Sequence, residues 1–123
     1  MGNRAVIRTP NSSKGVYCHW NGGRDTVEGI LEFLKRNKYK FDTEEELLKK
    51  ISEVYINCFS SRDRVEDVET LDMNNGDNGT YFIDRIRLEI VGRMYNEGEE
   101  QQVHPLDDLV AYIEKFVLNK VTA

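Results

Sequence analysis

The residue types that could bind a ligand gather in two glycine-rich stretches of the chain. The first spans residues 17–25 and reads Tyr-Cys-His-Trp-Asn-Gly-Gly-Arg-Asp, with a strand pattern before it and a helix pattern after it. Backbone amides at a helix N-terminus attract anions, and Arg24 and Trp20 would add a guanidinium and a ring. This stretch therefore favours a site for an anionic, ring-bearing ligand such as a nucleotide.

Asp25 supports a second interpretation of the same stretch. It stands where an N-cap residue belongs, so its carboxylate would occupy the amide donors and repel a phosphate. On these residues alone, a tight turn followed by a self-capped helix explains the sequence as well as an anion site does. His19 and Trp20 alternate along a strand, so one of the two side chains faces outward and could contact a base.

The second stretch, residues 74–79, reads Asn-Asn-Gly-Asp-Asn-Gly. All three residue types tolerate left-handed backbone conformations, so the pattern predicts a tight turn that links two strands. It holds more side-chain amides than a turn requires, which makes Asn75 and Asn78 candidates to hydrogen-bond a ribose or a base. For either residue taken alone, a role in the turn is the simpler interpretation. The spacing excludes a calcium loop, because Gly76 and Ile83 fall at ligand positions.

Two residues further along complete the candidate set. Phe82 offers a flat face for an adenine, although a core position is the commoner role of a phenylalanine. Arg93 follows Gly92, and its planar guanidinium can bind two phosphate oxygens at once.

The sequence offers no catalytic or metal-binding set. It has 2 cysteines, Cys18 and Cys58, which lie too far apart for a metal-binding pair and match no nucleophile signature. The carboxylates fall mostly on predicted helix surfaces, where solvation explains them. We expect a protein that is not an enzyme and that needs no metal or cofactor.

Composition limits the class of protein. The 123 residues suit a single domain, 1–123, and the net charge of -5 argues against a surface that grips duplex nucleic acid. No apolar run is long enough for a signal peptide or a membrane span, so we expect no membrane association and a cytoplasmic location.

Periodicity predicts the elements that must position these residues. Residues 3–9 and 16–20 alternate like strands and predict an N-terminal hairpin. Helical spacing predicts two central helices, one from Asp25 to about Asn37 and one that starts near Asp42, and a last helix after Pro105.

The rest of the pattern predicts a second hairpin, with residues 80–95 as one long strand whose core face includes Ile86 and Met94. Residues 60–72 fit no clean period, and we expect them to be irregular with a short strand near Thr70. The fold class is therefore α+β: a small antiparallel sheet of two hairpins packed against two central helices, with a C-terminal helix.

Three segments resemble the first family of Thoeris anti-defence proteins, which are small phage proteins. They are residues 2–7 (Gly-Asn-Arg-Ala-Val-Ile), residues 19–25 and residues 75–79 (Asn-Gly-Asp-Asn-Gly). The resemblance runs from residue 2 to about residue 95. It implies a protein that binds cyclic ADP-ribose isomers, which bacterial TIR-domain proteins make on infection, and sequesters them uncleaved so that the defence effector stays inactive.

The resemblance also implies site residues and partners. It points to Asn21, Arg24 and Asn75 in the two glycine-rich stretches, to Phe82 for base stacking and to Arg93 for the pyrophosphate. It implies a homo-oligomer, a dimer or a hexamer, with pockets near subunit contacts, a separate site for cyclic oligonucleotides, and a location in the cytoplasm of the infected bacterial host. We also expect the acidic residues 97–100 to form a lid. The alternative function is a small acidic phage inhibitor that binds a host defence protein directly.

Overall fold

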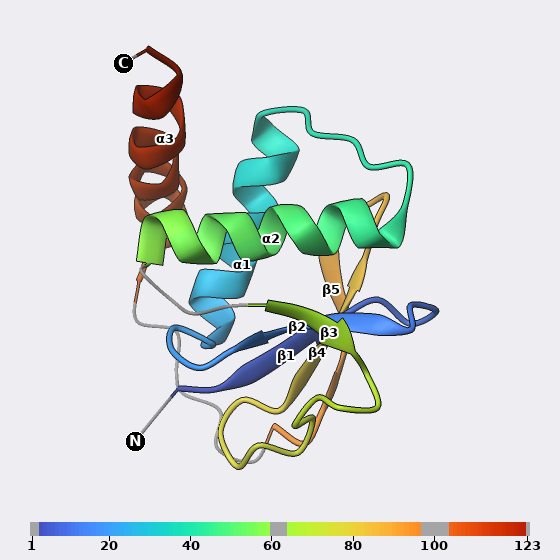
Figure 1. Cartoon of the computed structure of the whole chain (residues 1–123). Helices are drawn as coiled ribbons and strands as arrows, with labels where there is room; N and C mark the ends of the chain where they lie inside the picture. Colours follow the sequence, from blue (N-terminus) through green and yellow to red (C-terminus); the bar gives the residue numbers. More distant parts are fainter. Residues whose placement is uncertain (1–2, 60–63, 97–103, 123) are drawn as a thin grey trace.

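A computed structural model describes residues 3–59, 64–96 and 104–122 (Figure 1). The fold is α+β, as predicted. The strands are β1 (Ala5–Arg8), β2 (Lys14–Cys18), β3 (Arg64–Asp67), β4 (Thr80–Asp84) and β5 (Glu89–Met94). The helices are α1 (Arg24–Arg36), α2 (Glu44–Phe59) and α3 (Leu106–Thr122). In the described residues, no helix is both long enough and apolar enough to cross a bilayer.

The five strands form one sheet in the order β3-β2-β1-β4-β5. The hairpins β1–β2 and β4–β5 are antiparallel, but β1 and β4 run parallel and pair Val6 with Thr80 and Arg8 with Phe82. The sheet is therefore mixed rather than wholly antiparallel. A parallel pair needs a long crossover, which here contains β2, both central helices and β3.

The helices bury one face of the sheet. The stripe predicted for α2 is confirmed, because Leu47, Leu48, Ile51, Val54, Tyr55 and Cys58 are all buried. They meet sheet residues such as Ile7, Val16 and Ile83 in a single hydrophobic core. Each buried side chain of this size contributes roughly 1.5–3 kcal/mol, so this layer sets the position of the strand ends.

Residues 68–79 cover part of the other face of the sheet (Figure 1). A Cβ added at Gly15, which alternates with the core residue Val16, would lie 2.9 Å from Leu71 Cδ1. The hydroxyl of Thr80 donates to the Met73 carbonyl at 3.0 Å. The second glycine-rich stretch is thus part of a segment packed on the sheet rather than a hairpin turn.

The predicted single strand 80–95 is wrong, because the chain turns at residues 85–88 between β4 and β5. The Asp84 carboxylate causes the turn by accepting bonds from the amides of Ile86, at 3.1 Å, and Arg87, at 2.6 Å. Ile86 is consequently 73% exposed, and Met94 is also exposed. The β4–β5 register shifts between Phe82, which pairs with Gly92, and Ile83.

Two further predictions concern segments at the limits of the described chain. In residues 64–72 the strand lies at Arg64–Asp67, and Thr70 belongs to a turn, so the strand predicted near Thr70 is wrong. Residues 60–63 and the predicted lid, residues 97–100, lie outside the described residues.

Candidate functional site

The two glycine-rich stretches meet at one end of the sheet, and Asn3 joins them. The Asn3 amide donates to the His19 carbonyl at 3.0 Å, and its own carbonyl accepts from the Gly22 amide at 2.8 Å. The carboxamide of Asn78 donates to the Asn3 side-chain oxygen. The chain entering β1 therefore links both bends.

Tyr81 and Arg93 reinforce this link. The Tyr81 hydroxyl donates to the Gly22 carbonyl at 2.8 Å. The Arg93 guanidinium carbon lies 3.9 Å from the centre of the Tyr81 ring, and Nη2 donates to the Asn78 carbonyl at 2.8 Å. We call Asn3, Gly22, Asn78, Tyr81 and Arg93 the bend junction. The Arg93 guanidinium thus donates a hydrogen bond to the second stretch and lies over the ring of Tyr81, whose hydroxyl bonds to the first stretch.

Glycine is required where the backbones come closest. A Cβ at Gly22 would lie 2.5 Å from the Asn3 carbonyl oxygen, and one at Gly79 would lie 2.2 Å from the carbonyl oxygens of Met94 and Tyr95. Gly79 also has a φ of +69°, in the left-handed region. Glycine at these two positions therefore allows two backbone segments to pack closely against each other.

Asn75, predicted as a ligand-binding residue, uses its carboxamide within its own turn. Its Nδ2 donates to the carbonyls of Asp72, at 3.1 Å, and Gly79, at 3.0 Å. Its Oδ1 accepts from the amides of Asp77, at 3.1 Å, and Gly79, at 3.0 Å. The side chain is only 3% exposed. In this protomer Asn75 shapes the bend.

Phe82 and Arg24 lie apart from the junction. Phe82 alternates with the core residue Tyr81, so it faces away from the helices, where the Arg8 guanidinium lies 5.3 Å from the centre of its ring. Arg24 is half-exposed at the start of α1 and pairs with Glu28 at 3.4 Å. Arg93 belongs to the bend junction, and the structure does not gather all five predicted residues in one niche.

Asp25 does not cap α1, contrary to the second interpretation of the first stretch. The N-cap is Gly23, with no side-chain cap bond. The buried Asp25 carboxylate instead accepts from Nδ1 of His104 at 2.9 Å and from the amides of Thr26, at 2.8 Å, and His104, at 3.2 Å. Burial raises the pKa of Asp25, but the bonds from His104 and Thr26 outweigh it, so the pKa lies below its ordinary value. This contact joins the start of α3 to the first bend.

A cavity of about 290 Å³ opens beside the first bend. It is lined by Asn21, Thr26, Phe59, His104, Asp108, Leu109 and Tyr112. Asn21 is the only one of the five predicted site residues in this lining. The bend holds Asn21 at a φ of 60°, and the Tyr55 hydroxyl donates to the Asn21 carbonyl at 3.1 Å.

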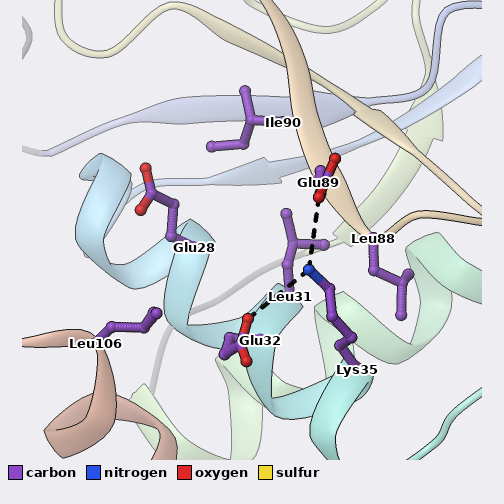
Figure 2. Close-up of a pocket in the computed structure, with 8 residues that line it drawn as sticks. All are labelled: Glu28, Leu31, Glu32, Lys35, Leu88, Glu89, Ile90 and Leu106. Atoms are coloured by element: carbon purple, nitrogen blue, oxygen red, sulfur yellow. Dashed lines mark ion pairs between the residues drawn. The ribbon is translucent and has the colours of Figure 1, made fainter.

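A second cavity, of about 220 Å³, lies between α1 and β5 and is shown in Figure 2. Its apolar floor is formed by Leu31, Leu88, Ile90 and Leu106. Lys35 lies 3.8 Å from both Glu32 and Glu89, while Glu28 adds a third carboxylate at the wall. Three carboxylates against one lysine disfavour a phosphate here, whereas the first cavity offers two aromatic side chains, Phe59 and Tyr112, to a flat ring.

Sequence reasoning missed three residues that line the first cavity. Phe59 ends α2, His104 lies two residues before α3, and Tyr112 lies in the second turn of α3. His104 lies 79 residues from its partner Asp25. The His-Pro pair ahead of a helix was the only signal, and it indicated a helix start rather than a site.

Comparisons with protein-family models, with curated proteins and with solved structures found no match to this chain. In the part of the chain that the structure describes, no group of three or more His, Cys, Asp or Glu side chains is placed to hold a metal ion. The case for a function therefore depends on the bend junction, the cavity beside it and the sequence resemblance.

Proposed function

We propose that this protein binds a cyclic ADP-ribose isomer and sequesters it without cleavage, and so blocks Thoeris immunity in the cytoplasm of the infected bacterium. The observation that carries the proposal is the meeting of the two stretches at the bend junction. These are the stretches on which the resemblance depends, and Arg93 donates to the Asn78 carbonyl of the second stretch at 2.8 Å.

The chemistry of the junction suits a diphosphate. The guanidinium of Arg93 is planar and permanently charged, and it is partly buried, so bonds to phosphate oxygens there are stronger than at a solvated surface. Sequestration requires tight binding, and nanomolar affinity corresponds to roughly 12 kcal/mol. One arginine cannot supply this, so the base must also be enclosed.

A homo-oligomer is part of the proposal. Exposed apolar side chains lie on the edge strand β5 and just after β2: Val91, Met94, Tyr95 and Trp20. An edge strand with apolar side chains is a ready site for pairing with a second copy. Such a copy would bring further groups, among them a second Phe82 and Arg24, toward the junction. A separate site for cyclic oligonucleotides remains part of the same proposal.

The experiment is a thermal-shift series of the purified protein against cyclic ADP-ribose isomers, linear ADP-ribose and cyclic dinucleotides. Ligand linkage raises the apparent stability with affinity and concentration, so a cyclic isomer should raise the melting temperature most. Absence of a shift with every cyclic isomer would contradict the proposal. Recovery of a stoichiometric bacterial protein in a pull-down would then favour direct inhibition of a host protein.

A further inference from the structure

The cavity beside the first bend has two aromatic walls from different helices. Phe59 of α2 and Tyr112 of α3 have ring centres 5.6 Å apart, and the Tyr112 hydroxyl donates to the Cys58 carbonyl at 3.0 Å. That bond fixes the Tyr112 ring, which remains 42% exposed. A held, accessible ring is a low-entropy surface for stacking a flat ligand.

Polar groups line the rest of the cavity. Asn21 presents a carboxamide from a backbone position set by the bend, and Asp108 presents an exposed carboxylate. In the described residues neither side chain has a hydrogen-bond partner within the protein. Both groups can accept a bond from an exocyclic amine, and the carboxamide can also donate to a ring nitrogen.

Charge and size restrict what can enter. Asp108 would repel a phosphate placed inside the cavity, as would the nearby Asp25 carboxylate. Pockets for drug-sized ligands measure about 300–1,000 Å³, so a cavity of about 290 Å³ suits one ring system rather than a whole dinucleotide. A flat, amine-bearing ring without a phosphate on it fits these limits.

We infer that this cavity is the purine subsite of the proposed ligand. It takes an adenine ring stacked on Tyr112, with its amine bonded to Asp108 and its edge to Asn21, while the sugar and phosphates stay outside. This inference rests on the proposed function. It assigns binding of the base to residues of α3, a helix that lies outside the part of the chain covered by the resemblance.

The test is calorimetric titration of the intact protein with AMP, IMP and ribose 5-phosphate. AMP should bind most tightly, because IMP has an oxygen in place of the amine and ribose 5-phosphate has no base. Tyr112→Leu should weaken AMP binding roughly 5- to 150-fold, the range for loss of one stacking aromatic. Tyr112→Phe, which keeps the ring but loses the bond to the Cys58 carbonyl, should weaken AMP binding much less than Tyr112→Leu.

Ile86→Ala is the control variant, since Ile86 is 73% exposed in the turn between β4 and β5 and does not line the cavity. It should leave AMP binding unchanged. If Tyr112→Leu does not fold, Asp108→Ala at an exposed position carries the test, and it should abolish the preference for AMP over IMP. Equal binding of AMP and IMP by the unaltered protein, or full AMP binding by both variants, would overturn the inference.

Failure of the inference and failure of the proposed function are distinguishable. Binding of cyclic ADP-ribose that none of these variants weakens would refute the purine subsite and leave sequestration intact. Binding of AMP that depends on Tyr112, without any binding of cyclic ADP-ribose, would support the subsite and refute sequestration.

Discussion

The two glycine-rich stretches differ in what they leave open to a ligand. In residues 74–79, both Asn75 and Asn78 are buried, and their side-chain amides donate to the backbone carbonyls of Gly79 and Arg4, respectively. Residues 17–25 turn outward: Asn21 faces a cavity and Trp20 is exposed. The comparison teaches that a stretch rich in amides need not be a binding surface. Residues 74–79 hold the backbone in place, whereas residues 17–25 expose side chains that a ligand can contact.

The largest expected effect is a loss of stability on substitution in residues 74–79. Gly79→Ala should destabilise the protein by more than about 3 kcal/mol, because the new Cβ would meet two carbonyl oxygens at 2.2 Å in a left-handed conformation. Gly23→Ala is the control, since its Cβ would meet side-chain atoms rather than backbone: Asp25 Oδ1 at 3.0 Å and Asn3 Nδ2 at 3.7 Å. Urea unfolding of both variants measures the difference. Equal stability would show that the backbones at the junction are not packed as described.

The next effect separates the two asparagines. Asn75→Ala should cost about 2–4 kcal/mol, because it leaves the buried Gly79 amide without its acceptor and removes both carbonyl contacts. Asn21→Gly should leave stability within about 1 kcal/mol, because glycine accepts the left-handed φ of 60° without strain. The same Asn21→Gly protein should bind AMP more weakly. Similar unfolding free energies for the two variants would contradict a structural role for Asn75 that Asn21 does not share.

Arg93→Ala should abolish the thermal shift with cyclic ADP-ribose while the protein without ligand stays folded. The variant loses the hydrogen bond to the Asn78 carbonyl and the cation–π contact with Tyr81, and these two contacts contribute about 1–2 kcal/mol, which a domain of this size tolerates. Arg93→Lys should recover part of the shift, because lysine keeps the charge but not the two-point geometry. A full shift with Arg93→Ala would refute the role of Arg93 in binding the diphosphate.

The smallest effect is on acid stability. The pKa of Asp77 is lowered by its hydrogen bond with Arg4, and the pKa of Asp25 is lowered by His104 and Thr26. A carboxylate with a lowered folded-state pKa stabilises the fold above its ordinary value of 3.8, and that stability is lost as the pH falls below it. Unfolding free energies should therefore decline below about pH 4, and Asp25→Asn should make the decline shallower. An unchanged slope in the variant would exclude Asp25 as a contributor.

Much of the fold followed from local patterns in the sequence. Helices α1 and α2 were predicted by their apolar stripes and start signals, and the first hairpin by its turn composition. The turn between β4 and β5 was missed because its residues, Arg85 to Leu88, include none of the usual turn formers, and the turn depends on the Asp84 side chain. The parallel pair β1–β4 was missed because no local pattern specifies which strands become neighbours.

The site was less predictable than the fold. Sequence alone marked both glycine-rich stretches, but their meeting depends on Asn3, whose bonds join residues 75 positions apart. The sequence also does not show that the side chain of Asn75 makes hydrogen bonds within its own turn, because a turn residue and a ligand-binding residue look alike in a sequence. The pairing of Asp25 with His104 and the aromatic walls of the cavity arise only when α3 packs against α1 and α2.

The central claim is that the protein binds and releases its ligand chemically unchanged, and a release assay tests this claim most directly. The purified protein is saturated with a cyclic ADP-ribose isomer, freed of unbound ligand, heat-denatured and analysed by mass spectrometry for what it releases. The account predicts recovery of the intact cyclic isomer in a fixed ratio to protein chains. Release of linear ADP-ribose or of smaller fragments such as AMP, or of no nucleotide at all, would contradict it.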